Sequence, residues 1–330
     1  MEVLVTGGAG FIGSHLCERL LARGDGVVAF DNFNDMYDPR LKERNAGDLS
    51  RHRRFECVRG DLRDRDAVRS AFARRSFDVV VHLAAMAGVR PSLKDPVLYE
   101  QVNCVGTLHL LDAVRERPQT KLIFGSSSSV YGANSKVPFA ETDPLENMVS
   151  PYAVTKRAGE LHAACYASLY GIPTACLRFF TVYGPKQRPE MAIALFADRI
   201  ERGEPVPMYG DGSTRRDYTY VDDILDGILR AIERCAGFEI YNLGESRTVA
   251  LAELVDLLAK AIGKPARVQK LPPQPGDVPI TYADVSKARA RLAYAPSVPI
   301  EERLARYVAW RRGAKSPAAP APHAPVFQTP

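Results

Sequence analysis

A tyrosine and a lysine four residues apart form the pair in this chain best suited to proton transfer. Tyr152 and Lys156 lie in SPYAVTKRAGE, where Ser150 followed by Pro151 is typical of a helix start. At i and i+4 the two side chains share one helical face. A free tyrosine, with a pKa of about 10, is a poor base at neutral pH, but a neighbouring ammonium group stabilises its phenolate. The pair predicts a general base, and a surface tyrosine beside a solvated lysine is the alternative.

Hydroxyl groups end a strand-like segment upstream of this pair. KLIFG runs into Ser126, Ser127, Ser128 and Ser129. At the carboxyl end of a parallel strand, these hydroxyls would hold a substrate hydroxyl against the phenolate. A serine-rich loop without chemistry is the alternative.

A glycine-rich turn follows the first strand-like run. In TGGAGFIG, Gly7, Gly10 and Gly13 precede a helical pattern. Glycine permits a tight turn and a close approach of the backbone to a pyrophosphate, which the amino end of the next helix attracts. The position of the motif, between strand and helix, favours a dinucleotide site over a turn that merely needs glycine.

Acidic residues at the next two strand ends refine the cofactor. Asp31 ends the second strand at the spacing where a carboxylate accepts the adenosine ribose hydroxyls and repels a 2′-phosphate, so NAD is favoured over NADP. Asp61 and Leu62, after the third strand, lie where adenine would be contacted. A helix N-cap is an equally good interpretation of Asp61.

The elements that position these residues alternate regularly up to about residue 180. Near-continuous apolar strands are separated by helical spacing at 13–23, 64–74, 97–115 and 151–170. This order predicts an α/β fold with a doubly wound parallel (Rossmann) sheet over residues 1–183.

Beyond residue 183, loops rich in proline and glycine indicate a smaller α/β substrate-binding lobe. Helices are expected at about 191–202, 222–234, 250–262 and 300–312. The strand-like segment 239–244 is expected to return to the main sheet. We assign 217–245 to the first domain, 184–216 and 246–313 to the lobe, and 314–330, rich in proline and alanine, to a disordered tail.

Composition narrows the function classes. The 330 residues are 46% hydrophobic and 25% charged, no apolar run reaches the roughly 20 residues of a membrane span, and no leader pattern is evident, so a cytoplasmic enzyme is expected. The net charge of +5 includes a basic cluster at 51–54, interpreted as a solvated loop and alternatively as a polyanion site; no nucleic-acid module accompanies it. Six scattered cysteines are interpreted as reduced core thiols, and six histidines without ligand spacing predict no metal site.

These motifs together resemble a known family. TGGAGFIG, VVAFDN, HLAA, SSSSVYG, the Tyr152/Lys156 pair and LRFFTVYGP occur in the order found in extended short-chain dehydrogenases that act on nucleotide sugars, over roughly residues 2–312. More narrowly, DNFNDMYDPRLK, AGVRPS, LRFFTVYGPKQRPEM and GDGSTRRDYTYVDDI resemble the bacterial UDP-glucuronate 4-epimerases.

The resemblance implies roles for individual residues. Tyr152 is the base, Lys156 its modulator and a contact to the cofactor ribose, and Ser127 a hydrogen-bonding partner of the reacting oxygen. The implied NAD contacts are Gly7, Gly10, Phe11, Ile12, Gly13, Asp31, Asn32, Asp61, Leu62, Leu83, Ala84, Ala85, Asn103, Tyr152 and Lys156. The implied UDP-sugar contacts are Arg90, Ser127, Ser128, Ser129, Tyr152, Thr181, Arg188, Arg216 and Asp277. A surface ion pair is the alternative for Arg188, Arg216 and Asp277. A homodimer through the helices 97–115 and 151–170 is also implied.

Several positions separate related activities. Thr181 and Gln274 stand where UDP-galactose epimerases usually carry Asn and Arg. Ser128-Ser129 replaces the Asp-Glu pair of 4,6-dehydratases, and Ser129 replaces a Glu of UDP-glucuronate decarboxylases. We therefore expect epimerisation of UDP-glucuronate at carbon 4 through a 4-keto intermediate. The alternatives are a UDP-glucose 4-epimerase, a UDP-glucuronate decarboxylase and, in a different class, a non-catalytic NAD-sensing protein.

Overall fold

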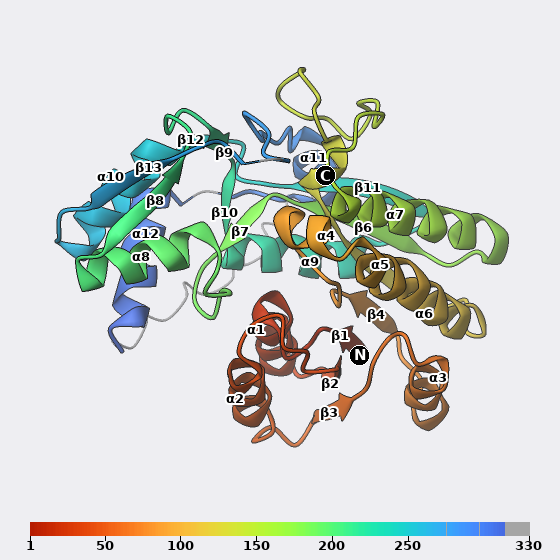
Figure 1. Ribbon diagram of the computed structural model, residues 1–330. Helices are drawn as coiled ribbons and strands as arrows, with labels where there is room; N and C mark the ends of the chain where they lie inside the picture. The colour runs from red at the N-terminus through yellow and green to blue at the C-terminus, as the bar shows by residue number, and fades with distance from the viewer. Residues whose placement is uncertain (275, 297, 314–330) are drawn as a thin grey trace, which may run out of the picture.

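A seven-stranded parallel sheet forms the centre of the computed structural model, which describes residues 1–274, 276–296 and 298–313 (Figure 1). Its strand order is β3-β2-β1-β4-β5-β6-β11, and every neighbouring pair is parallel. The predicted doubly wound sheet is confirmed. The strands are β1 (Glu2–Thr6), β2 (Gly26–Asp31), β3 (Phe55–Arg59), β4 (Val79–His82), β5 (Lys121–Ser127), β6 (Thr174–Phe179) and β11 (Phe238–Leu243).

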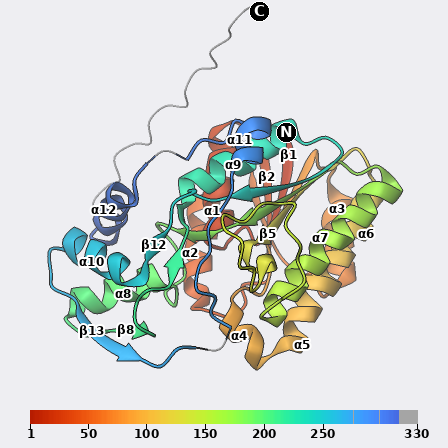
Figure 2. The same cartoon turned by 90° about the horizontal axis from the view of Figure 1, so that it is seen from above.

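Both faces of this sheet are covered by helices (Figures 1 and 2). Along β1, Val3 and Val5 belong to one apolar cluster, whereas Leu4 belongs to the cluster on the opposite face. Alternate side chains of a strand point to opposite faces, so apolar residues in succession require cover on both. One face carries α1 (Phe11–Ala22), α9 (Val221–Arg234) and α11 (Ser286–Leu292); the other carries α3 (Arg65–Arg74), α6 (Gly106–Arg115) and α7 (Pro151–Tyr170).

The helix expected over 97–115 is interrupted by a wider turn. It consists of α5 (Pro96–Tyr99), the π-helical segment η1 (Glu100–Val105) and α6. A π-helical turn accommodates an extra residue and is common near functional sites. Within it, Asn103 is buried and bonds to the loop after β4, a tertiary contact that helical periodicity does not encode.

A smaller lobe lies beside the sheet (Figure 2). Its helices are α8 (Ala192–Arg202), α10 (Leu251–Ile262) and α12 (Ile300–Arg311), with β8 (Pro205–Tyr209) parallel to β13 (Arg267–Leu271). Further short pairs join β7 (Thr181–Tyr183) to β10 (Tyr218–Tyr220) and β9 (Arg215–Arg216) to β12 (Val249–Ala250). The remaining helices are α2 (Pro39–Leu49), α4 (Val89–Lys94) and the short 3₁₀ turn η2 (Ser128–Tyr131).

The chain crosses between the two parts more than once. The segment expected to return to the sheet is β11, which pairs with β6 at the sheet edge. However, α11, which the sequence assigned to the lobe, packs against α9 and β11 of the main part. A seven-residue helix carries too little pattern to show where it docks.

The free cysteines are divided between the core and the surface. Cys17, Cys104 and Cys176 are buried free thiols, but Cys57 and Cys165 are exposed, so the assignment of all cysteines to the core is wrong for these two. Apolar neighbours along the chain did not reveal which side of the strand or helix each thiol occupies. The tail expected at 314–330 lies outside the described residues.

Three carboxylates cluster where α9, α12 and the end of β11 meet. Asp217 accepts hydrogen bonds from the backbone amides of Glu245 (2.7 Å) and Ala283 (3.1 Å), and Asp223 lies 3.3 Å from the Arg303 guanidinium. Burial raises the pKa of Asp217 and of Asp223 to about 6. Burial, together with both of these neighbours, raises the pKa of Glu245 from 4.5 to about 8.

These shifts predict that the protein loses stability as pH rises. Because the folded pKa of Glu245 exceeds its unfolded value, the folded state binds more protons between pH 4.5 and about 8, and the stability this contributes is lost through that window. We expect Glu245→Gln to raise the melting temperature at pH 9 by about 2 °C relative to wild type, with little difference below pH 5. Thermal melts across pH measure this. The exposed Glu146→Gln is the control, and identical pH slopes for wild type and Glu245→Gln would contradict the prediction.

Candidate active site

Tyr152 stands at the start of α7, at the carboxyl edge of the sheet. Ser150 caps this helix by accepting a hydrogen bond from the Ala153 amide at 3.2 Å, as the Ser-Pro start predicted. The Tyr152 ring packs edge-on against Tyr99, with centroids 6.2 Å apart. Burial raises the pKa of Tyr152, while the Ser127 hydroxyl and the Arg188 guanidinium act in the opposite direction by favouring the phenolate. Without further assistance, Tyr152 is therefore deprotonated less readily at neutral pH than free tyrosine.

Lys156 is buried beneath Tyr152 on the same helical face. Its ammonium group donates to the Gly125 carbonyl at 2.7 Å and lies 5.2 Å from the centre of the Phe124 ring. Burial lowers the pKa of Lys156 to about 8, against the opposing effect of Cys104 and Glu160. The lysine is thus positioned by the end of β5, the strand that carries the serines, and the alternative of a solvated lysine is wrong.

The serines begin the turn after β5. The Ser127 hydroxyl accepts from the Ser129 amide at 3.2 Å and lies 3.1 Å from the Ser129 hydroxyl, so it caps η2. Ser128 and Ser129 are half-buried. Capping and chemistry are compatible here, because the same hydroxyl also influences Tyr152.

A buried ion pair lies under this site. Arg178 on β6 makes two hydrogen bonds to the Glu160 carboxylate on α7, at 2.8 and 2.9 Å, with both side chains essentially inaccessible to solvent. Glu160 also accepts from Ser126 at 2.7 Å, and Arg178 donates to the Tyr131 hydroxyl at 3.0 Å. Neither Glu160 nor Arg178 was singled out from the sequence. The i+4 spacing of Glu160 from Lys156 was the available signal.

The glycine turn is shaped by close backbone packing. Gly7 has φ +69°, and a Cβ atom there would lie 2.8 Å from the Ala84 nitrogen; a Cβ on Gly13 would lie 2.1 Å from the Gly7 carbonyl oxygen. Gly10 caps α1, so Phe11 and Ile12 are the first helical residues. A Cβ on Gly10 would meet only the Gly7 oxygen at 3.1 Å and the Tyr37 hydroxyl at 3.9 Å. The cradle thus leaves room at the helix amino terminus, as a pyrophosphate requires.

Asp31 and Asp61 serve different purposes at neighbouring strand ends. Buried Asp31 accepts from the amides of Ala9 (3.1 Å) and Phe33 (2.9 Å), which fixes its carboxylate beside the glycine turn. Asp61 pairs with Arg63 and accepts from Asn32 at 3.0 Å; the bond to Arg63 is the main cause that lowers the pKa of Asp61 to about 2.

The N-cap interpretation of Asp61 is wrong. Asp64 caps α3, accepting from the amides of Asp66 and Ala67. The adjacent Leu62 is buried, and its Cβ approaches within 2.8 Å of the position that a Cβ on Gly106 would occupy. Any adenine contact from Leu62 would come from the little surface it leaves exposed.

The loop after β4 is held by side chains rather than by glycine. Leu83 and Ala84 donate their amides to the Thr6 carbonyl and hydroxyl, each at 3.2 Å. The Met86 backbone amide donates to the Asn103 side-chain oxygen (2.8 Å), and the Asn103 side-chain nitrogen donates to the Met86 carbonyl (2.9 Å) and to the Thr155 hydroxyl (3.0 Å). Both donors of Asn103 are therefore occupied, so its role is to hold the loop containing Ala85.

Buried His82, the last residue of β4, extends this support. Its Nδ1 lies 2.7 Å from the Thr6 hydroxyl and its Nε2 lies 2.9 Å from the Thr107 hydroxyl. Burial, with Lys156 nearby, lowers the pKa of His82 to about 3, so the ring is neutral. The neutral ring links β1, β4 and α6 under the loop.

The residues expected to bind the nucleotide sugar form two groups. Arg188 lies near Tyr152, with a guanidinium nitrogen 3.4 Å from the Ala87 carbonyl and 3.3 Å from Glu190. Arg90 pairs with Asp277 at 2.8 Å. Arg216 lies near this pair: burial lowers the pKa of Arg216, Asp277 raises it and Arg90 lowers it further. The half-buried Thr181 begins β7 and donates its amide to the Asp217 carbonyl at 3.0 Å.

Asp277 opens onto a pocket of about 710 Å³ in the smaller lobe, lined also by Tyr209, Lys270 and Gln274. The Arg90 guanidinium stacks over the Tyr209 ring at 4.6 Å from its centre. Here the surface ion-pair alternative for Asp277 holds geometrically, since its pair with Arg90 is partly exposed, while the pocket leaves space for a ligand beside it.

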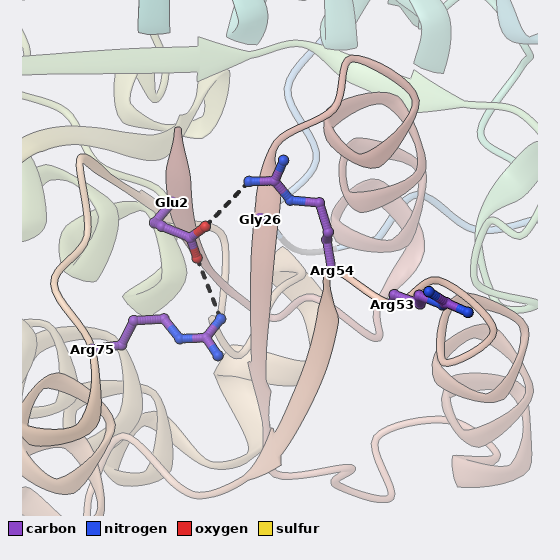
Figure 3. A pocket seen from close by; sticks show the side chains of 5 residues that line it. All are labelled: Glu2, Gly26, Arg53, Arg54 and Arg75. Atoms are coloured by element: carbon purple, nitrogen blue, oxygen red, sulfur yellow. Dashed lines mark hydrogen bonds and ion pairs between the residues drawn. The ribbon is translucent and has the colours of Figure 1, made fainter.

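A second hollow lies at the opposite, amino edge of the sheet (Figure 3). The Glu2 carboxylate at the start of β1 lies between Arg54 (3.4 Å) and Arg75 (3.3 Å), and Arg53 points away from it. Residues 51–54 are all exposed, as the solvated-loop interpretation expects. Because ligands of doubly wound sheets collect at the carboxyl edge, this hollow is not the active site.

Among the described residues, no set of three or more His, Cys, Asp or Glu side chains is placed to hold a metal ion. Within the same part of the chain, none of the helices is both long and apolar enough to cross a bilayer.

The parallel sheet, the glycine cradle and the Tyr-Lys pair define a Rossmann fold of the short-chain dehydrogenase class. Residues 3–244 match the model of the NAD dependent epimerase/dehydratase family, and the chain belongs to that family. NAD is accordingly its cofactor. The cradle and the fixed Asp31 carboxylate fit this dinucleotide.

Relatives of known or assigned activity cover almost the whole chain. A probable UDP-glucuronate 4-epimerase of Rhizobium meliloti is 41% identical over 94% of this chain and 96% of its own. The Bacillus cereus UDP-glucuronic acid 4-epimerase in complex with UDP-glucuronic acid and NAD superposes with a TM-score of 0.89 at 37% identity, covering 95% of this chain and 99% of that one. The Thermus thermophilus UDP-glucose 4-epimerase complex with NAD gives a TM-score of 0.87 at 37% identity, covering 96% and 100%.

The buried ion pair predicts a large loss of stability when one partner is removed. Arg178→Met leaves the buried Glu160 carboxylate with the partly exposed Arg157 guanidinium, 3.0 Å away, as its remaining charged partner, and we expect it to lower the free energy of unfolding by about 3 kcal/mol. Adding Glu160→Gln removes the incompletely paired charge and restores part of the loss. Urea unfolding measures both variants. The surface pair Arg306–Glu302 on α12 supplies the control, since Arg306→Met is expected to cost less than about 1 kcal/mol; equal losses for the two arginine variants would contradict the prediction.

Proposed function

We propose that this protein is a UDP-glucuronate 4-epimerase, which interconverts UDP-glucuronate and UDP-galacturonate without losing the carboxylate. The observation that carries the proposal is the site itself: Ser127 beside Tyr152, with hydroxyls at both Ser128 and Ser129. Relatives named for this activity cover most of the chain.

The chain's own residues would move one proton back and forth. Tyr152, as the phenolate, takes the proton of the sugar 4-hydroxyl while Ser127 holds that oxygen by a hydrogen bond. NAD supplies the hydride acceptor and donor for carbon 4 when bound. Lys156 favours the phenolate by its charge and contacts the nicotinamide ribose. The 4-keto sugar then rotates so that its other face meets the cofactor. Tyr152 returns the proton to the oxygen on carbon 4, and there is no net oxidation.

The remaining cofactor contacts come from the glycine turn and from the loops after β2, β3 and β4. Gly7, Gly10 and Gly13, with Phe11 and Ile12, place the α1 amides at the pyrophosphate, and Asp31 accepts the adenosine ribose hydroxyls. Asn32, Asp61 and Leu62 border the adenine. The residues that complete the cofactor site are Leu83, Ala84, Ala85 and, by holding their loop, Asn103.

Ring rotation requires a tight hold on the nucleotide and a loose hold on the sugar. Arg90, Arg216 and Asp277 lie together beside the pocket of the smaller lobe, remote in the sequence from Tyr152, and we assign them to the UDP group. Guanidinium groups suit diphosphate oxygens because they donate in a planar fork. Arg188, near Tyr152, is left to the sugar end.

Retention of the carboxylate is the step that separates this function from its rivals. The 4-keto intermediate is a β-keto acid, which decarboxylates readily when its carboxylate lies perpendicular to the ring carbonyl. Ser129 donates a hydrogen bond where decarboxylases carry a Glu, and with Ser128, Thr181 and the positive charge of Arg188 it holds the carboxylate in plane. Likeness to the Thermus thermophilus UDP-glucose 4-epimerase keeps a neutral-hexose epimerase as the second candidate.

We further propose that the protein is a cytoplasmic homodimer. Exposed apolar residues gather on the helices expected to pair, with Val97 on α5 and Val105 in η1 beside Val154 and Leu161 on α7. On α7 these two lie seven residues apart, on one helical face. A second copy would remove them from water.

Product analysis is the direct test of the substrate. We expect UDP-glucuronate to give UDP-galacturonate, with no UDP-pentose and no added NAD required. NMR of the product identifies it. Parallel incubation with UDP-glucose is the comparison, and either faster turnover of UDP-glucose or UDP-pentose as the main product would overturn the assignment. No turnover of any UDP-sugar would favour a non-catalytic NAD-sensing protein.

Removal of the proposed base separates chemistry from binding. Tyr152→Phe deletes the proton acceptor but little contact area, so we expect kcat to fall by about 10²–10⁴-fold while the Kd for UDP-glucuronate changes less than about threefold. Steady-state kinetics and calorimetric titration provide the two numbers. Loss of binding in proportion to loss of turnover would show that Tyr152 is structural.

A further inference from the structure

The space above the glycine cradle has a side-chain wall that the reaction does not explain. Gly7 and Gly13 face backbone atoms, whereas the open side of Gly10 is bounded by the Tyr37 hydroxyl, 3.9 Å from where a Cβ would lie. Tyr37 belongs to the segment 34–38 between β2 and α2, far from Tyr152 in the sequence. Its phenol therefore lies at the amino terminus of α1, where a bound pyrophosphate meets the helix.

Buried Lys42 fixes this segment from α2. Its ammonium group donates to the backbone carbonyl and to the side-chain oxygen of Asn34, both at 2.8 Å, and lies 4.6 Å from the centre of the Tyr37 ring. The exposed fraction of Lys42 is only 5%. A buried lysine that bonds to a loop carbonyl and stacks on an aromatic ring orders the segment at both ends.

The surroundings of Tyr37 favour an anion beside it. Burial and the Asp31 carboxylate raise its pKa, so its hydroxyl stays protonated and available as a donor. Lys42 and Arg188 contribute two positive charges nearby, and an Arg188 nitrogen lies 3.8 Å from the Met36 sulfur. A neutral donor with two cations in its surroundings is suited to a phosphate oxygen.

We propose that residues 34–38 form a strap over bound NAD, in which Tyr37 donates a hydrogen bond to the pyrophosphate and Lys42 holds the strap closed. The strap retains the cofactor within the enzyme between the outward and returning hydride steps. It goes beyond the proposed function, because it holds for whichever UDP-sugar is the substrate.

Retention of NAD is the measurement that tests the strap. Tyr37→Phe keeps the ring on Lys42 but removes the donor. We expect NAD to dissociate about tenfold faster or more from this variant, as the loss of one hydrogen bond to a charged group implies. Tyr166→Phe is the matched control, since the Tyr166 hydroxyl donates to Asp112 at 2.9 Å, away from the cradle. Radiolabelled NAD loaded on each protein is chased with unlabelled NAD.

Two further measurements locate the contact. ADP-ribose carries the pyrophosphate without nicotinamide, so its affinity should fall by a similar factor in Tyr37→Phe. Lys42→Met should speed NAD release at least as much as Tyr37→Phe. Equal melting temperatures of the NAD-free wild type and Tyr37→Phe would show that folding is unaffected. Release of NAD from Tyr37→Phe at the rate of Tyr166→Phe, or an effect on NAD but not on ADP-ribose, would overturn the proposal.

Discussion

The ion pair between Arg178 and Glu160 is the constraint on which the catalytic geometry depends. It joins β6 to α7 at the level of the serine turn, and Ser126, Tyr131 and Arg157 add further hydrogen bonds to it. A buried charge pair tolerates little displacement, because any lengthening leaves a charge in a medium of low polarity. Its position therefore fixes the spacing between the strand that carries Ser127 and the helix that carries Tyr152 and Lys156. Asn242 of β11 bonds to Tyr131 at 2.7 Å and extends the same network to the sheet edge.

Much of the fold and the core of the site follow from local sequence patterns. The glycine turn, the Ser-Pro start of α7 and the Tyr-Lys spacing are features of a few consecutive residues, and each is found where it was predicted. Roles that depend on distant partners were not readable in this way. Asn103 turns out to hold a loop, α3 is capped by Asp64 rather than Asp61, and α11 docks on the main sheet. The contacts of Asn103 and the docking of α11 are set by neighbours far away in the chain, whereas the cap of α3 is local and was placed three residues too early.

The two groups of expected sugar-binding residues suit the two demands of the reaction. Arg90, Arg216 and Asp277 lie with the pocket of the smaller lobe, whereas Arg188 lies with Tyr152 and Tyr99. In the proposed function, this separation of the nucleotide-binding residues from the reacting carbon would leave the sugar ring free to turn. The hydroxyls of Ser127, Ser128 and Ser129 lie at the end of β5 and in the turn after it. The proposed site thus combines a rigidly held base with space in which the sugar ring can rotate.

One apolar cluster runs without interruption from Val5 on β1 and Leu16 on α1 to Phe196 on α8, Leu258 on α10 and Leu304 on α12. Relative motion of two parts across a continuous close-packed core would open voids, so the lobe cannot swing on a hinge as an independent body. Substrate entry must then depend on local movements of the loops around the active site. For the same reason the lobe cannot be transferred alone to another member of the family. Its inner face and the helices that cover the sheet would have to be replaced together.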